Sequence, residues 1–299
     1  MVGDNIWLDY DQAALDDQYN QRVLVPDAND YMARHLVLSE AVCNRLDCRL
    51  DVSYGPGDDQ KLDIFPVPGA TNTPVVVYFH GGAWTRWDKA NNSYQAPAFI
   101  DAGAAFVSVN FSLAPKVDLE ELIRQCRAAV AWVHGHADEF GADTGQLYVA
   151  GHSSGGHVAG LMAVTDWTEW GLPADAIKGV AAASGMYELT PVRLSSRNEY
   201  LNLDAAAVAR LSAIGQILDT MPAMVIAYGG GEAVEFRRQS ADFAAELMRR
   251  GHSCRELDLP GLHHFEVAEL FADADGPLLR AMFEMMGMEN VSHPSTSSG

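Results

Sequence analysis

Residues 147–164 read Leu-Tyr-Val-Ala-Gly-His-Ser-Ser-Gly-Gly-His-Val-Ala-Gly-Leu-Met-Ala-Val. An apolar run typical of a strand opens this stretch, a helix-compatible run closes it, and the pattern G-x-S-x-G lies between them, from Gly151 to Gly155. A tight strand-to-helix turn projects a serine hydroxyl above a sheet when small residues flank it, because the two backbones must pass closely. The stretch therefore predicts such a turn, with Ser153 as candidate nucleophile. The competing interpretation of the pattern is a glycine-rich turn without chemistry.

Strand-type and helix-type segments alternate on both sides of this turn. Continuous apolar runs at 74–79 and 104–112 are typical of strands buried on both faces. Residues 118–137 carry apolar side chains at helical spacing, which predicts a crossover helix. Further strands are predicted at 178–185, 223–231 and 254–261, a helix at 235–251, and an antiparallel opening pair at 48–55 and 60–67. Repeated strand–helix–strand units predict an α/β fold with a mostly parallel central sheet flanked by helices.

Three segments fall outside this alternation. Residues 1–45 lack strand patterning and are expected to form a small helical cap. The α/β domain then spans 46–288, with a polar, Asn- and Arg-containing insertion at about 186–221 that extends the cap above the sheet. Residues 289–299 are poor in apolar side chains and are predicted to be a disordered tail.

Composition narrows the classes of partner. The 299 residues hold 20 Lys and Arg against 40 Asp and Glu, a formal net charge of −20 that repels nucleic acid and anionic lipid. No stretch has the length of a signal peptide's apolar core or of a membrane span, which favours the cytoplasm. The four scattered cysteines, expected to be reduced, do not resemble a zinc site, and no phosphate-binding glycine loop occurs, so no cofactor or metal is implied. The expected partner is a small molecule, and a homodimer is left open.

A second glycine-rich motif, His80-Gly81-Gly82-Ala83-Trp84, follows the strand predicted at 74–79. Acyl transfer builds negative charge on a carbonyl oxygen, and backbone N–H groups that point at that oxygen stabilise it. Gly81 and Gly82, together with the N–H of Ser154, are therefore the candidate oxyanion hole.

The base and the acid of a triad should follow Ser153 if the chain order is serine, acid, histidine. His263 and His264 follow the last predicted strand, where the loop returns to the edge of the sheet that carries Ser153, and position alone does not choose between them. Glu232 and Glu235 follow the strand at 223–231. Glu232 is favoured because it lies in the turn itself, whereas a carboxylate at 235 is explained by the dipole of the helix that it opens.

Aromatic residues and histidines in the predicted loops and cap are candidates for substrate binding, namely Trp84, His157 and Tyr19. The alternative is that they only pack the cap and the turn against the body of the protein.

The motifs together resemble α/β-hydrolases of the kynurenine formamidase (arylformamidase) kind, related to the hormone-sensitive-lipase-like carboxylesterases. The resemblance spans most of the chain and rests on QYNQR at 18–22, HGGAW at 80–84, NFSLAP at 110–115, GHSSGGH at 151–157, SGMYEL at 184–189, EFRRQS at 235–240 and HHF at 263–265. It implies that Ser153 is the nucleophile, that Gly81 and Gly82 form the oxyanion hole, and that His264, the histidine before Phe, is the base. Glu232 stands where the family usually has Asp, and Ser154 where Ala is common.

The expected activity is that of a serine hydrolase cleaving an aryl amide or formamide, similar to N-formylkynurenine, or an ester through an acyl-enzyme intermediate. A short-chain carboxylesterase with the same triad is the alternative. A rival of another class is a non-catalytic α/β-hydrolase that serves as a binding module, which would be expected to lack the nucleophile or the base.

Overall fold

The computed structural model describes residues 4–288, so the predicted disordered tail at 289–299 lies outside the described residues. One eight-stranded sheet forms the centre, in the order β1-β2-β4-β3-β5-β6-β7-β8. The strands are β1 (Arg49–Ser53), β2 (Lys61–Phe65), β3 (Thr73–Phe79), β4 (Ala105–Val109), β5 (Ala142–His152), β6 (Gly179–Ala183), β7 (Ala223–Gly229) and β8 (Cys254–Leu259).

The pairing of the strands confirms the predicted α/β class. β1, β2 and β4 pair antiparallel, and every neighbouring pair from β4 to β8 is parallel. β5 begins at Ala142, which pairs with Thr73 at the start of β3. This is earlier than the apolar run at 147 indicates, because residues 143–146 are not apolar and are not fully buried. The carboxyl ends of the parallel strands therefore meet at one edge of the sheet, which we call the carboxyl edge.

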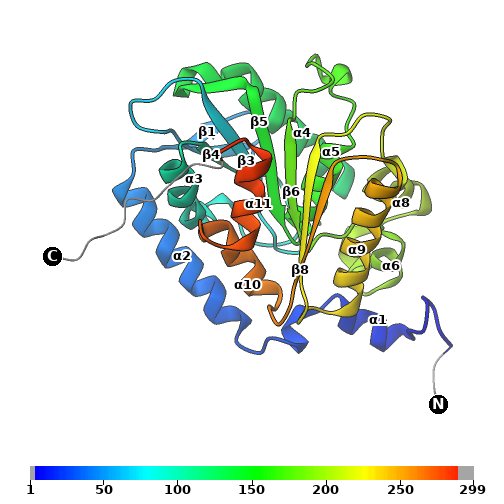
Figure 1. Cartoon of the computed structure of the whole chain (residues 1–299). Helices are drawn as coiled ribbons and strands as arrows, with labels where there is room; N and C mark the ends of the chain where they lie inside the picture. The colour runs from blue at the N-terminus through cyan, green and yellow to red at the C-terminus, as the bar shows by residue number, and fades with distance from the viewer. Residues whose placement is uncertain (1–3, 289–299) are drawn as a thin grey trace.

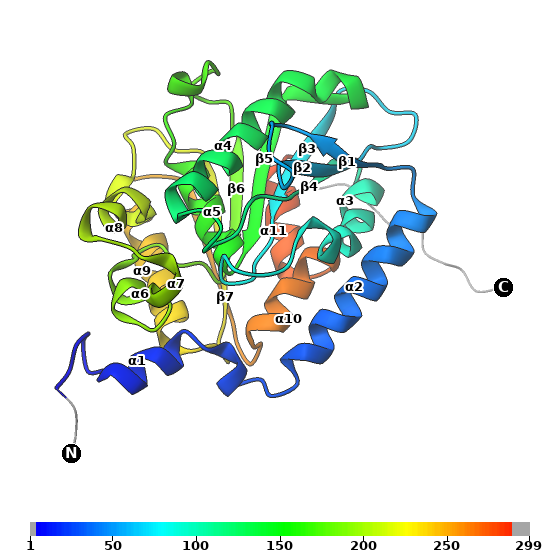
Figure 2. The ribbon, with the colours of Figure 1, turned by 180° about the vertical axis from the view of Figure 1, so that it is seen from behind.

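Helices cover both faces of the sheet (Figures 1 and 2). One face is covered by α4 (Leu119–His136), α5 (Ser154–Ala163) and α9 (Val234–Arg249), and the other by α2 (Ala28–Arg45), α3 (Ala96–Ala102), α10 (His264–Glu269) and α11 (Pro277–Met285). α4 shows how the sequence specifies a helix: the Asp118 carboxylate accepts from the Glu121 N–H at 2.8 Å, and Leu122, Ile123 and Val130 bury one apolar face.

The remaining helices form a cover at the carboxyl edge. α1 (Gln12–Gln18) and the 3₁₀ helix η1 (Gln21–Val23) come from the N-terminal segment; α6 (Thr190–Leu194), α7 (Asn198–Leu201) and α8 (Ala205–Leu211) come from the insertion. Figures 1 and 2 both show α1 crossing below the sheet beside α6. The Gln12 amide donates to the Leu194 carbonyl at 3.0 Å, and the Ser196 N–H donates to the Asp16 carboxylate at 2.6 Å. The two cover segments, far apart in sequence, thus contact each other directly.

Short 3₁₀ helices complete the chain: η2 (Lys89–Asn91), η3 (Ser93–Gln95), η4 (Ala137–Phe140), η5 (Trp167–Trp170), η6 (Ala213–Gln216) and η7 (Leu270–Ala272). Among residues 4–288, no helix combines the length and the apolar character needed to cross a membrane.

Candidate active site

Ser153 lies at the apex of the predicted strand-to-helix turn, between β5 and α5. Its backbone has φ 59° and ψ −124°, a conformation that a non-glycine residue rarely adopts, and its N–H donates to the Ala183 carbonyl at 2.9 Å. A Cβ at Gly151 would lie 2.2 Å from the Gly155 carbonyl oxygen, and a Cβ at Gly155 would lie 2.0 Å from that of Phe79. The backbones therefore pass as closely as the sequence predicts, and only glycine fits at both positions.

His264 is the histidine that meets Ser153. It opens α10, and its Nε2 lies 2.9 Å from the Ser153 Oγ. His263 instead caps the same helix: its Nδ1 accepts from the N–H groups of Phe265 and Glu266, and its Nε2 lies 3.1 Å from the Tyr31 hydroxyl. His264 thus contacts Ser153 and His263 caps α10, a difference that their sequence positions could not show.

Glu232 lies on the far side of the His264 ring. Its Oε2 is 3.6 Å from the His264 Nδ1, and neither atom has another hydrogen-bond partner among the described residues. Its Oε1 accepts from the Ser184 hydroxyl at 2.5 Å and from the Gly229 N–H at 3.2 Å. The carboxyl group is therefore held by one oxygen while the other faces the imidazole.

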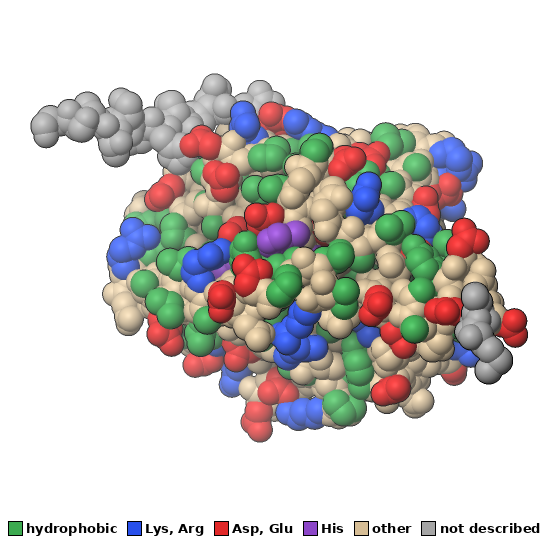
Figure 3. Space-filling view, turned by 90° about the horizontal axis from the view of Figure 1, so that it is seen from below, with side chains coloured by type: hydrophobic (Ala, Val, Ile, Leu, Met, Phe, Trp, Pro, Cys, Tyr) green, Lys and Arg blue, Asp and Glu red, His purple; other side chains and the backbone are tan. Residues whose placement is uncertain are grey.

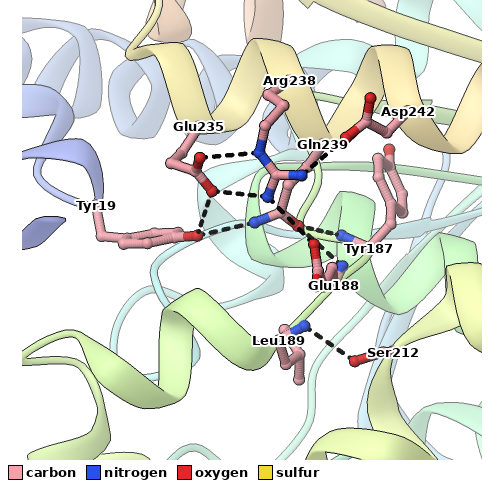
Figure 4. Close-up of polar contacts among 9 residues, drawn as sticks. All are labelled: Tyr19, Tyr187, Glu188, Leu189, Ser212, Glu235, Arg238, Gln239 and Asp242. Atoms are coloured by element: carbon pink, nitrogen blue, oxygen red, sulfur yellow. Dashed lines mark hydrogen bonds and ion pairs between the residues drawn. The ribbon is translucent and has the colours of Figure 1, made fainter. Parts of the chain in front are cut away.

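Glu235, the alternative acid, is engaged elsewhere (Figure 4). Both of its oxygens accept from the Arg238 guanidinium at 2.9 Å, and its Oε2 lies 3.5 Å from the Tyr19 hydroxyl. Gln239 joins the same network by donating to the Tyr19 hydroxyl at 2.8 Å. This network fastens the N-terminal segment to α9 and leaves Glu232 as the carboxylate that faces His264.

Burial sets the electrostatics of the pair. Loss of solvent raises the pKa of Glu232 to about 7, against the lowering effect of the Ser184 hydrogen bond. Loss of solvent also lowers the pKa of His264, and the positive charge of Arg197 lowers it further. The imidazole is therefore neutral near pH 7, which is the form that accepts a proton.

The loop after β3 brings Gly81 and Gly82 beside the turn. A Cβ at Gly81 would lie 3.2 Å from the Ser153 Cβ, and one at Gly82, where φ is +116°, would lie 2.0 Å from the Arg86 carbonyl oxygen. Within residues 4–288, neither glycine N–H donates to a protein acceptor. The Trp84 N–H donates to the Ser154 hydroxyl at 3.3 Å and ties this loop to α5, whose first N–H belongs to Ser154. The three predicted oxyanion-hole residues therefore lie together next to Ser153.

Trp84 and His157 do not line the pocket, in contrast to their predicted role in substrate binding. The Trp84 ring is buried, and its Nε1–H donates to the His157 Nδ1 at 3.2 Å. The His157 Nε2–H in turn donates to the Leu211 carbonyl at 2.9 Å. All the ring nitrogens are thus satisfied inside the protein, and the pair links the loop after β3, α5 and the insertion. Their position fits the alternative, in which these side chains pack the cap and the turn against the body of the protein.

The pocket at Ser153 has an empty volume of about 790 Å³, which includes space open to solvent. Tyr19, a candidate for substrate binding, lines it, and Trp87 and Phe265 add apolar surface. Sequence reasoning missed the other lining residues from the cover and the adjoining loops, which include Asn20, Gln21, Arg22, Arg86, Asn91 and Arg197. No local motif marks them, because they come together only when the segments carrying them fold over the carboxyl edge. In the described part of the chain, no group of three or more His, Cys, Asp or Glu side chains is arranged to hold a metal ion.

Comparisons with known proteins agree with this geometry. The model of the BD-FAE family matches residues 62–247. The kynurenine formamidase of Salmo salar is 30% identical over 246 residues, covering 80% of this chain and 82% of that protein. The esterase LipQ of Mycobacterium tuberculosis is 27% identical over 242 residues, covering 73% of this chain and 57% of that protein. Among solved structures, a putative thioesterase from Silicibacter sp. superposes with a TM-score of 0.77 at 29% identity, covering 89% of this chain and 97% of the other.

The family match and the formamidase relative each span well over half of the chain. Fold, motifs and relatives agree, and the resemblance seen in the sequence is confirmed. The chain therefore belongs to the BD-FAE family, within the α/β-hydrolases that include kynurenine formamidases and carboxylesterases, and is a hydrolase of the ester- and amide-cleaving type.

Proposed function

We propose that the protein is a serine hydrolase in which Ser153 attacks the carbonyl carbon of an aryl amide, above all an aryl formamide. The observation that carries the proposal is the 2.9 Å separation of the Ser153 Oγ and the His264 Nε2. Neutral His264 takes the hydroxyl proton as the C–O bond forms, then passes it to the departing nitrogen. Water, deprotonated by His264 in turn, releases the acyl group as a carboxylic acid and restores the serine.

Glu232 and the loop after β3 assist this chemistry. Glu232 holds the His264 ring with its proton on Nδ1, so that Nε2 is free to accept, and stabilises the imidazolium that forms. The N–H groups of Gly81, Gly82 and Ser154 bind the carbonyl oxygen as it becomes negative, and each donor of this kind contributes roughly a hundredfold to a thousandfold in rate.

The formamide substrate is supported by the Salmo salar relative, which is named kynurenine formamidase, and by aromatic side chains in the pocket. Tyr19, Trp87 and Phe265 line it and offer flat apolar surface to an aryl leaving group. N-formylkynurenine or a similar N-acyl aromatic amine is the leading substrate class, and no protein or nucleic acid partner is required.

A fluorophosphonate probe tests the nucleophile. Wild-type protein should be labelled, and Ser153→Ala should not be. Ser196→Ala is the matched control, because the hydroxyl of this exposed serine makes no hydrogen bond among the described residues, and its labelling should equal that of the wild type. Turnover in Ser153→Ala should fall roughly a millionfold. Absence of labelling in folded wild-type protein would contradict the proposal.

A short-chain carboxylesterase is the second candidate, favoured by the similarity to esterase LipQ. Both activities use the same residues, so substrates must separate them. We expect formanilides to be cleaved with a higher kcat/KM than N-acetyl anilides, and at least as well as acetyl esters after correction for their spontaneous hydrolysis. Ester cleavage without formanilide cleavage would identify the carboxylesterase.

A further inference from the structure

Three arginines, Arg22, Arg86 and Arg197, line the pocket at Ser153, and no Asp or Glu does. We call these three residues the arginine rim. They come from η1, from the loop after β3 and from the start of α7 in the insertion, so three separate segments contribute one positive charge each. The chain as a whole carries a formal charge of −20, and acidic side chains are visible elsewhere on this face (Figure 3). The local sign of the pocket thus opposes that of the molecule.

Three carboxylates that contact the site or its pocket wall are directed at groups other than the arginine rim. Glu232 faces His264, Glu235 is held by Arg238, and Glu269 accepts from the His35 ring at 2.9 Å and from Arg34. Within residues 4–288, no carboxylate lies within 4 Å of any guanidinium of the arginine rim. Among the described residues, the rim therefore has no ion-pair partner.

Arg197 is the deepest member. Its Nε and Nη2 donate to the same Tyr19 carbonyl oxygen, and its guanidinium lies over the Trp84 and Tyr19 rings at 5.7 Å and 5.5 Å. These contacts fix the fork in place yet use only part of its five N–H groups. None of these contacts is with an anionic group, so the guanidinium can still form an ion pair with a bound anion. Its planar fork matches the geometry of a carboxylate.

We propose that the arginine rim, with Arg197 at its centre, selects substrates that carry a carboxylate beside the bond to be cleaved. The inference rests on the proposed function, because it names the substrate class of the Ser153 site. A carboxylate bound by a fixed guanidinium away from bulk water gains a charge-assisted hydrogen bond that a neutral analogue lacks. Such a contact corresponds to roughly a tenfold to hundredfold preference in kcat/KM.

Two matched substrate pairs test the preference. On the leaving-group side, 2-formamidobenzoate is compared with its methyl ester; on the acyl side, 4-nitrophenyl hydrogen succinate is compared with 4-nitrophenyl butyrate. For each pair the ratio of kcat/KM, anionic over neutral, is divided by the ratio of spontaneous hydrolysis rates. Wild type should prefer the anionic member of at least one pair by tenfold or more.

Three variants assign the preference to the rim. Arg197→Gln should reduce it at least tenfold, and Arg197→Lys, which keeps the charge without the fork, should restore part of it. Because Arg197→Gln also loosens Tyr19, Arg86→Gln provides an independent test: its side chain is exposed, has no polar partner among the described residues, and should lower the preference without affecting folding. Arg193→Gln, an exposed arginine on α6 outside the pocket, is the matched control and should leave the preference unchanged.

A wild-type enzyme that cleaves the neutral substrates through Ser153 but shows no anionic preference in either pair would overturn this inference and leave the proposed function standing. The same holds if the preference survives in both Arg197→Gln and Arg86→Gln. Absence of turnover of every substrate, anionic and neutral, in folded wild type would instead reject the proposed function.

Discussion

At the scale of single residues, the site depends on buried polar groups that stability alone would not favour. Glu232 is 4% exposed and His264 is 5% exposed, and burial disfavours the charged form of each. Ser153 adds a strained backbone, enforced by the glycines around it. Buried ionisable groups and a strained backbone both lower the stability of the folded protein. They are found together where the chemistry is proposed to occur, a pattern typical of active sites.

The pKa of Glu232 predicts how Glu232→Gln changes stability with pH. Because the folded protein raises this pKa from 4.5 to about 7, Glu232 contributes its stabilisation fully below pH 4.5 and loses it as pH rises to about 7. Gln has no charge to bury, so the difference in Tm, variant minus wild type, should increase between pH 4.5 and pH 8. Turnover should fall by roughly a thousandfold or more, since the imidazole loses its partner. A difference in Tm that shrinks with rising pH would contradict the assignment.

The neighbouring histidines predict opposite phenotypes. His264→Ala removes the proposed base and should reduce kcat by several orders of magnitude with a small change in stability. His263→Ala removes the cap of α10 and should lower the free energy of unfolding by about 1 kcal/mol while most of the activity remains. Urea unfolding and ester hydrolysis, measured on both variants, check the pair; equal loss of activity in the two would show that the capping histidine also takes part in the reaction.

At the scale of elements, the site lies at the carboxyl edge, where the loops that follow four strands come together. The loops after β3, β5, β7 and β8 carry Gly81, Ser153, Glu232 and His264. These loops were predictable because each follows a predicted strand and contains glycine or a titratable residue at the strand end. The pocket wall was not predictable, because Arg22, Arg86 and Arg197 come from segments without a repeating pattern. Contacts between the N-terminal segment and the insertion hold Arg22 and Arg197 on the same side of the pocket as the loop that carries Arg86.

Trp84 and His157 show that sequence position does not give the direction of a side chain. Both lie in the candidate catalytic motifs of the sequence, which made them candidates for contact with substrate. In the fold both side chains are buried: the Trp84 ring donates to the His157 ring, and the His157 ring donates to the Leu211 carbonyl. Sequence position places a residue near a site, but side-chain direction depends on the backbone, and Trp84 has φ 62°.

Gly82→Ala tests the loop after β3 as a rigid element. A methyl group there would lie 2.0 Å from the Arg86 carbonyl oxygen at φ +116°, so the loop must change shape and its N–H groups must move. We expect kcat to fall at least a hundredfold. Gly103→Ala is the control, because this glycine also has positive φ, +92°, but has open space around its Cα and lies outside the pocket. It should cost about 1 kcal/mol of stability and leave kcat unchanged; equal kcat values in the two variants would reject the role of the loop.

At the scale of the whole molecule, the cover at the carboxyl edge is joined to the core. Leu15 of α1 is fully buried in the same apolar cluster as the strands and α4, and Tyr19 is fastened to α9 by Gln239. The first part of the segment predicted to form a helical cap therefore shares its apolar packing with the sheet and α4. The pocket wall should consequently unfold together with the sheet rather than open on its own.

Leu15→Ala measures this coupling. Removing a fully buried leucine side chain leaves a cavity and costs about 2–5 kcal/mol when the surrounding structure is part of the cooperative core. Leu8→Ala, in the same N-terminal segment but 59% exposed, is the matched control and should change stability by less than about 0.5 kcal/mol. Urea unfolding followed by far-UV circular dichroism and by tryptophan fluorescence should give coincident transitions, shifted to lower urea in Leu15→Ala alone. If the N-terminal segment is instead an independent flap, Leu15→Ala will leave the main transition in place and will lower only activity, because the segment that carries Tyr19 and Arg22 will detach while the sheet stays folded.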